Sequence, residues 1–255
     1  MDYNKYFEGY PKDKGSIIYL IDKVKQSQRT WETEFTHFLT PEEQIILKKI
    51  CCEDLINVEI YGGIGECERG IGAIYKEDLR GSFPISILKI SGNFKFEKLN
   101  HRDYLGAVLS LGITRDKIGD INVFEDGAEI YVHSDICSYI ELNLNKIKHT
   151  GIKTSIIELS GGRKKIQEFN DLRINITSPR LDCVVSAILN TSRAKAVSII
   201  KSGEVKLNYS VTEEICGKIK IGDLISLKGF GRIRVDDILG VTKSDRLTLL
   251  VKKYL

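Results

Sequence analysis

The order of strand-like and helix-like segments in the middle of the chain constrains its fold most. Six segments show these signals in turn: a strand at 84–91, a helix at 100–109, strands at 119–125 and 128–133, a helix at 134–144 and a strand at 154–160. Asp126-Gly127, between the two central strands, is a dipeptide typical of two-residue hairpin turns. Asn100 and Ser134 are residue types that cap helix starts. The predicted order is therefore β-α-β-β-α-β.

This order is the split arrangement of ferredoxin-like folds, which RNA-recognition motifs also use. The fold does not by itself indicate RNA binding. The strand at 128–133 lacks the usual set of stacking aromatics, and Asp126 and Glu129 would repel a phosphate backbone. Tyr131 is its candidate base-stacking residue, and the alternative is an ordinary sheet position.

The first 80 residues alternate helix and strand signals and predict a small α/β domain. A helix is expected over 16–29, and a second from Thr40-Pro41-Glu42-Glu43, which has the pattern of a capping box, to Asp54. Strands are expected at 57–61 and 71–75. The glycine-rich segment 62–70 between them fits neither nucleotide-loop spacing and carries two glutamates. A turn or bulge is favoured there over a phosphate loop.

Charge is unevenly distributed along the 255 residues, although the formal net charge is only +3. Residues 1–80 carry 11 Lys/Arg and 15 Asp/Glu, and residues 81–160 carry 9 and 10. Residues 161–255 carry 18 and 10, a net of +8, which predicts a polyanionic partner for the last third. The length predicts two or three domains. We expect an α+β protein with domains at 1–80, 81–165 and 178–255, joined by the basic segment 161–165.

The last third begins with two short helix signals and a strand. Ser178-Pro179 is expected to start the first helix, and Ser192 caps a second helix that Gly203 ends. A strand at 204–208 follows. These segments, with the later IKIGDLISL, resemble the S-four RNA-binding domain, named after ribosomal small-subunit protein four. The resemblance spans about residues 180–235 and implies an αα-β surface that holds structured RNA.

Basic side chains in this region give the predicted RNA contacts. Arginine offers a planar fork to phosphate, whereas lysine acts as a point charge. The predicted RNA-binding residues are Arg180, Arg193, Lys195, Lys201, Lys206, Asn208, Lys218, Lys220 and Lys228. If about five phosphates are neutralised, the logarithm of affinity falls with the logarithm of salt concentration at a slope of roughly −3.5 to −4.5.

Two further segments carry a resemblance that covers the whole chain. LNHRDYLGAVLSLGITRDKIGDI, residues 99–121, and YGGIGECERGIGAIY, residues 61–75, are similar to the YlmH family. The resemblance implies a bacterial cytoplasmic protein encoded near cell-division genes. It also implies association with large ribosomal subunits that carry a stalled peptidyl-tRNA, in ribosome-associated quality control. Arg102, Arg115 and Tyr131 form a possible second RNA surface. In the alternative, Arg102, Arg115 and Asp120 make helix-end and turn contacts.

No arrangement of residues in the sequence indicates catalysis. His133 and Cys137 have metal-ligand spacing but no partners in sequence, and no CxxC pair occurs among the six cysteines, which we expect to be reduced thiols. Asp182 lies in the predicted binding helix and is not expected to act as a nucleophile. We expect a monomeric, cytoplasmic, non-enzymatic protein that binds rRNA or tRNA, with no cofactor, metal, membrane or small-molecule substrate. The alternatives are an RNA-modifying or RNA-processing enzyme with a site in residues 1–165, or a cell-division adaptor.

Overall fold

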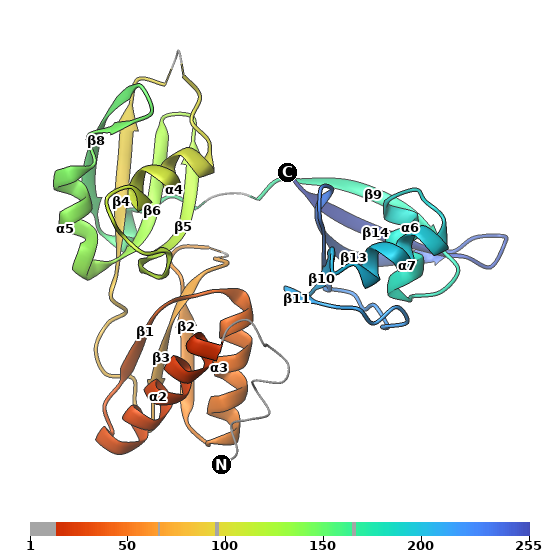
Figure 1. Ribbon diagram of the computed structural model, residues 1–255, viewed down its shortest axis with the longest axis horizontal. Coiled ribbons are helices and arrows are strands. Elements are labelled where there is room, and N and C mark those ends of the chain that lie inside the picture. The colour runs from red at the N-terminus through yellow and green to blue at the C-terminus, as the bar shows by residue number, and fades with distance from the viewer. Residues whose placement is uncertain (1–13, 66, 95–96, 165–166) are drawn as a thin grey trace. The chain divides into compact units, whose positions relative to one another are not determined.

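The computed structural model describes residues 14–65, 67–94, 97–164 and 167–255, which form two compact units, residues 1–165 and 166–255 (Figure 1). The described residues fold into six α-helices and three antiparallel sheets. The expected α+β class is confirmed. Residues 1–80 and 81–165, predicted as separate domains, each contribute one sheet to the same compact unit.

The first sheet of the N-terminal unit and its two helices are built from residues 14–75. The elements are α2 (Lys14–Thr30), β1 (Glu34–Leu39), α3 (Pro41–Glu53), β2 (Asn57–Tyr61) and β3 (Gly70–Tyr75). The strand order is β1-β3-β2, and α2 and α3 pack on one face around an aliphatic core (Figure 1). The predicted capping box is present, because Thr40 and Glu43 each accept a hydrogen bond from the other's backbone N–H. The strand β1 was not predicted.

The second sheet follows the predicted β-α-β-β-α-β order. Its main elements are β4 (Ile85–Gly92), α4 (His101–Leu109), β5 (Ile118–Phe124), β6 (Gly127–His133), α5 (Ser134–Asn143) and β8 (Thr150–Ile157). The strand order is β5-β6-β4-β8-β7, in which β7 (Lys146–Ile147) is a short addition at the edge. The two residues of the β5–β6 turn are Glu125 and Asp126, one position earlier than the predicted Asp126-Gly127, and Gly127 is the first residue of β6. Gly127 has a φ of +148°, and a Cβ there would collide with the carbonyl of Ile90, so this position requires glycine.

The two faces of this second sheet are both covered within the unit. Helices α4 and α5 pack on one face around Leu88, Ile130 and Val132. On the other face, Ile87 and Tyr131 join a hydrophobic cluster with residues of the first sheet and with the ring of Phe83, which lies in the connection between the two sheets. This cluster explains why residues 1–165 form one compact unit, since it removes apolar surface of both sheets from water.

The C-terminal unit is a six-stranded sheet with two helices. Its elements are β9 (Phe169–Ile176), α6 (Leu181–Ile188), α7 (Arg193–Lys201), β10 (Val205–Leu207), β11 (Ser210–Val211), β12 (Leu224–Leu227), β13 (Gly231–Val241) and β14 (Leu247–Tyr254). The strand order is β11-β10-β12-β13-β14-β9, and α6 and α7 share one core with the sheet. Figure 1 shows both helices on the same face of the sheet.

Two predictions for this unit need correction. The unit begins before residue 178, because β9 pairs with β14 along its whole length. The first helix begins at Leu181 with Arg180 as its N-cap, and not at Ser178. The backbone at Arg180 is extended and forms a β-bridge with Lys218, and the N–H of Ile219 donates to the carbonyl of Pro179. This pairing leaves the chain helical only from Leu181 onward.

Among the helices of the described residues, no single one is long and apolar enough to span a membrane. Helices α6 and α7, which meet at a bend of 109°, reach that length and hydropathy only as a pair.

Candidate nucleic-acid interface

Helix α7 presents basic side chains because its apolar positions face the core. Ala196 and Ile200 are buried against the sheet, whereas Lys195 and Lys201 are exposed. Ser192 caps the helix as predicted, with its hydroxyl accepting a hydrogen bond from the backbone N–H of Lys195. The helix therefore places two of the predicted lysines in solvent on a rigid element.

A carboxylate of α6 brings two of the predicted arginines together. Asp182 accepts hydrogen bonds from Arg180 Nε at 3.1 Å and Nη2 at 3.2 Å, and from Arg193 Nη2 at 2.7 Å and Nε at 3.3 Å. It also accepts one from the backbone N–H of Cys183 at 3.0 Å. The side chain of Asp182 is 2% exposed, but those of Arg180 and Arg193 are 37% and 56% exposed. Two guanidinium groups thus reach the surface from one buried anchor.

The electrostatics of this cluster favour the ionised carboxylate. Burial opposes ionisation of Asp182, but the hydrogen bonds from Arg193 and Arg180 outweigh it and hold the pKa of Asp182 below its usual value. The anchor is therefore charged at neutral pH. Lys218 is next to this cluster, because its backbone forms an isolated antiparallel β-bridge with the backbone of Arg180.

Asp223 organises a second pair of predicted residues. Asn208 donates from Nδ2 to Asp223 Oδ1 at 2.9 Å and accepts at Oδ1 from the backbone N–H of Leu224 at 2.9 Å. The other oxygen of Asp223 accepts from the backbone N–H of Lys220 at 2.7 Å. The Asn208 amide is thus used inside the fold, and Asn208 itself sits at a φ of +48°. Asparagine tolerates this backbone conformation in the turn after β10. Asn208 is also exposed, so its role as an RNA contact stays a prediction.

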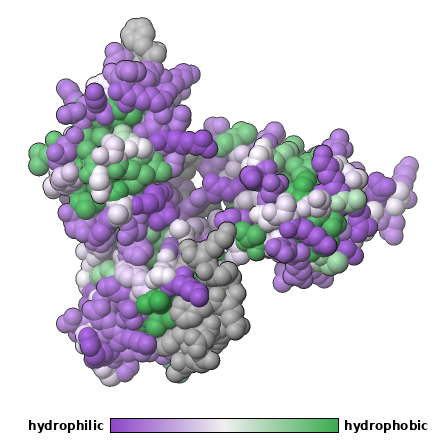
Figure 2. Space-filling view, in the orientation of Figure 1, coloured by the Kyte–Doolittle hydropathy of each residue, from purple (hydrophilic) through white to green (hydrophobic). Residues whose placement is uncertain are grey.

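The predicted lysines of this unit all reach solvent. Lys228 lies 3.4 Å from Glu204 in an exposed ion pair. The exposed lysines are Lys195, Lys201, Lys206, Lys218, Lys220 and Lys228. Figure 2 shows hydrophilic residues over much of the visible face of this unit, with smaller hydrophobic areas between them. These lysines are therefore accessible, and their contacts with RNA stay a prediction.

The possible second RNA surface is largely internal. Tyr131 is fully buried, and its hydroxyl accepts from the backbone N–H of Ile64 at 3.3 Å. Gly63 packs directly against its ring, at a φ of +124°. The ring is therefore not available to stack on a base in this structure, which corrects that expectation. The glycine-rich segment is the connection between β2 and β3, and one of its glycines provides this close approach.

Arg163 covers the face of the second sheet on which Tyr131 lies. Its backbone N–H and Nε donate to the carboxylate of Glu129 at 2.8 and 2.7 Å, and its Nη1 donates to Asp126 at 2.8 Å. The guanidinium lies 3.8 Å from the ring centroid of Phe124, a cation–π contact. Glu129 is 1% exposed. The face that an RNA-recognition motif offers to bases is thus filled by this chain's own residues.

Arg115 also serves the fold of the N-terminal unit. Its Nη1 donates to the carbonyls of Ile118 and Gly119, and burial lowers its pKa to about 10, with the nearby charge of Arg69 adding to the decrease. Arg102, by contrast, is exposed in the first turn of α4. Arg115 therefore makes turn contacts, as in the alternative interpretation. Of the residues predicted to form a second RNA surface, Arg102 is the one that is exposed.

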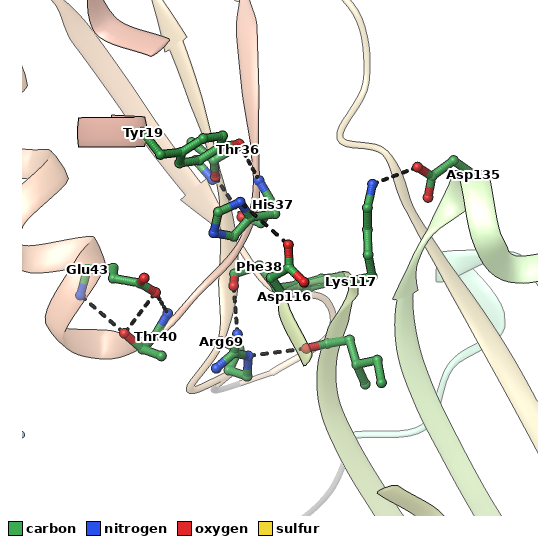
Figure 3. Close-up of polar contacts among 12 residues, drawn as sticks. Tyr19, Thr36, His37, Phe38, Thr40, Glu43, Arg69, Asp116, Lys117 and Asp135 are labelled. Atoms are coloured by element: carbon green, nitrogen blue, oxygen red, sulfur yellow. Dashed lines mark hydrogen bonds and ion pairs between the residues drawn. The ribbon is translucent and has the colours of Figure 1, made fainter. Parts of the chain in front are cut away.

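Polar contacts join the two sheets of the N-terminal unit at Arg69 and Asp120. Arg69 donates from Nη2 to the carbonyl of Phe38 at 2.7 Å and from Nε to that of Ile118 at 3.1 Å (Figure 3). The carboxylate of Asp120 accepts from the backbone N–H groups of Glu68 and Arg69 at 2.7 and 3.1 Å. Burial raises the pKa of Asp120, against the effect of these two hydrogen bonds. The residues that resemble the YlmH family at 61–75 and 99–121 therefore meet in one contact.

His37 lies in the same region, and its surroundings oppose protonation of its ring. Its ring stacks on Tyr19 with centroids 4.3 Å apart, and its Nδ1 is 3.9 Å from Asp116 (Figure 3). Burial lowers the pKa of His37, and the charge of Asp116 only partly opposes this. The folded state therefore favours the neutral ring, so the unfolded state takes up the proton first as the pH falls below about 6.5.

We expect the stability of this unit to decrease as the pH is lowered from 7.5 to 5.5, through the ordinary histidine pKa toward the lower folded value. Thermal unfolding at both pH values measures the effect. In His37→Gln, which cannot titrate, the decrease in Tm should be smaller than in the wild type. An equal decrease in both proteins would place the pH sensitivity elsewhere.

The described residues contain no group of three or more His, Cys, Asp or Glu side chains that could hold a metal ion. The two residues of the His133–Cys137 pair make other contacts. Nδ1 of His133 lies 2.6 Å from Asp135, and Cys137 is on the buried side of α5, where burial raises its pKa to about 11.

Comparisons with known proteins follow this geometry. A family model described as the putative RNA-binding domain in YlmH matches residues 79–161. The chain is 27% identical over 244 residues to the ribosome-associated protein quality control protein P2 of Bacillus subtilis (strain 168), covering 94% of this chain and 95% of that protein. The solved structure of the cell division protein ylmH from Streptococcus pneumoniae shares the fold, with a TM-score of 0.51 and 24% identity. That match covers 58% of this chain and 93% of the other.

Fold and surface together define an α+β protein with a compact N-terminal unit and a C-terminal unit that exposes basic residues. The match in the middle of the chain and the similarity over its length together support the YlmH family for this chain.

Proposed function

We propose that this protein binds RNA on the large ribosomal subunit and acts in quality control of stalled translation. The observation that carries the proposal is the cluster in which buried Asp182 holds Arg180 and Arg193 at the surface, beside helix α7 and its exposed lysines. Several cations on rigid elements suit a phosphate backbone better than a single small anion. The printed name of the Bacillus subtilis relative and the RNA-binding description of the family model support the same proposal.

The finer parts of the proposal concern what the C-terminal unit holds. We propose that it has the S-four type of RNA-binding surface and grips rRNA or tRNA through phosphates. The element order α6, α7, β10 supports this, because it is the αα-β order implied by the resemblance. We further propose that the protein is a monomeric, cytoplasmic binder without catalytic activity. Asp182 is the carboxylate that could most easily be taken for a catalytic group, and its negative charge is compensated by ion pairs with two arginines.

Sedimentation with ribosomal subunits tests the proposal. The full chain is mixed at low salt with empty large subunits and with large subunits that carry peptidyl-tRNA, and each mixture is run on a sucrose gradient. We expect the protein to move with the subunits and to be released as salt increases, because phosphate contacts weaken when counterions compete. A protein that stays at the top of both gradients at low salt would overturn the proposal. New modified nucleosides or fragments in the incubated RNA would instead favour an RNA-modifying or RNA-processing enzyme.

A further inference from the structure

One carboxylate in the C-terminal unit is buried, and the side chains that bind it are cations that reach the surface. Asp182 is 1% exposed and is one of the few buried charged residues among those described, yet its partners Arg180 and Arg193 both reach solvent. The two arginines come from different places, one before α6 and the other at the start of α7. A single carboxylate therefore fixes side chains that are 13 positions apart in the sequence.

We propose that Asp182 is a positioning residue that presents Arg180 and Arg193 together to the phosphates of one stretch of RNA backbone. The inference rests on the proposed function and adds to it the reason for the local arrangement. A guanidinium carries five N–H groups. Asp182 engages Nε and Nη2 of each arginine, which leaves the other N–H groups of both for a ligand.

The physical argument is one of preorganisation. Two long cationic side chains would repel each other and sample many rotamers, and binding would have to order both of them at a free-energy cost. The carboxylate reduces the repulsion and fixes both planes before RNA arrives. Because the pKa of Asp182 is held below its usual value, the anchor stays ionised at neutral pH.

This role makes a prediction opposite in sign to simple electrostatics. Removing a negative charge from an RNA-binding surface should strengthen the binding of a polyanion if charge alone matters. If Asp182 acts through the two arginines, then Asp182→Asn should weaken RNA binding, because the neutral amide holds the guanidinium groups less firmly. The sign of the change therefore separates the two explanations.

The experiment measures binding of the full-length protein to a fluorescein-labelled RNA stem-loop by fluorescence anisotropy at several salt concentrations. We expect Asp182→Asn to weaken binding by about five- to twenty-fold, the scale expected from losing the order of two side chains. The matched control is Asp245→Asn, which removes the same charge from the exposed β13–β14 turn. Asp245 has a φ of +57°, which asparagine also tolerates, and we expect its binding to be unchanged or slightly stronger.

Coupling to the arginines gives a readout that a purely structural role would not change. In a background of Arg180→Ala with Arg193→Ala, the further change Asp182→Asn should have little effect on affinity, because the residues through which it acts are gone. A second variant leaves the carboxylate in place: Arg180→Lys with Arg193→Lys keeps the charge but loses the planar fork. We expect this variant also to bind RNA several-fold more weakly, and it keeps the test open if Asp182→Asn does not fold.

The outcomes distinguish this inference from the proposed function. Wild-type protein that does not bind the stem-loop at low salt contradicts RNA binding itself. Wild-type protein that binds, together with an Asp182→Asn variant that folds and binds equally or more tightly, overturns the positioning role and leaves RNA binding intact. The double-lysine variant binding as tightly as the wild type would also overturn it.

Discussion

Replacing Arg69 by alanine is expected to lower the free energy of unfolding of the N-terminal unit by about 2–4 kcal/mol, since hydrogen bonds of charged donors to buried acceptors are costly to lose. Arg69 donates to the carbonyl of Phe38 and, together with Arg115, to that of Ile118, and both Phe38 and Ile118 are fully buried. The substitution removes these donors at the place where the two sheets meet. Urea unfolding followed by the fluorescence of Trp31, the single tryptophan of the chain, measures the loss.

Arg102→Ala is the matched control for this experiment. It removes the same side chain from the exposed first turn of α4 in the same unit, and we expect a change within about 0.5 kcal/mol. Equal stability losses in both variants would mean that the Arg69 contacts do not join the sheets. The same Arg102→Ala protein, assayed for RNA binding, also tests the accessible member of the predicted second RNA surface.

Removing the charges of Arg193 and Lys195 together is expected to weaken RNA binding by roughly ten- to a hundred-fold at low salt, and to reduce the salt slope by about 1.4 if each contacts one phosphate of a single-strand-like backbone. Both side chains are exposed at the start of α7. The measurement is the affinity of Arg193→Ala/Lys195→Ala for RNA over a series of salt concentrations. The effect should be similar for different RNA sequences, because phosphate contacts carry no sequence information.

The matched control is Lys243→Ala with Arg246→Ala, which removes the same two charges from the exposed turn between β13 and β14. If this variant loses as much affinity as the α7 variant, the decisive quantity is the net charge of the unit and not the surface around α7. If the α7 variant binds like the wild type while the control does not, the interface lies on the hairpin.

Local signals in the sequence predicted much of the secondary structure. The capping box at Thr40 and Glu43 and the Ser192 cap each act within four residues, so the sequence alone contains the partners. The Asp126-Gly127 signal predicted the hairpin correctly but placed its two turn residues one position too late. The strand β1 escaped prediction because Thr36 is buried in it: the hydroxyl of Thr36 accepts from the N–H of Gly72 in β3, a partner far along the chain.

Roles that depend on distant partners were the ones that sequence reasoning missed or reversed. Tyr131 stayed open between a base-stacking residue and an ordinary sheet position, because nothing near it in sequence shows that Gly63 and Ile64 cover it. Asp182 was expected to belong to the binding helix, but its burial between Arg180 and Arg193 depends on how α6 and α7 meet. The basic residues themselves could be predicted, because exposed charge needs no partner to be recognised.

The cover over the sheet face, made by Tyr131, Gly63 and Arg163, has a consequence for the kind of RNA that the proposed function involves. An open sheet of this type distinguishes RNAs by stacking unpaired bases on its aromatic rings. With that face filled, the groups left to meet RNA are arginines and lysines, which contact the sugar–phosphate outline. Such a protein would select its target by the three-dimensional shape of a folded RNA, as at a fixed location on a ribosomal subunit, and would be indifferent to base substitutions that preserve that shape.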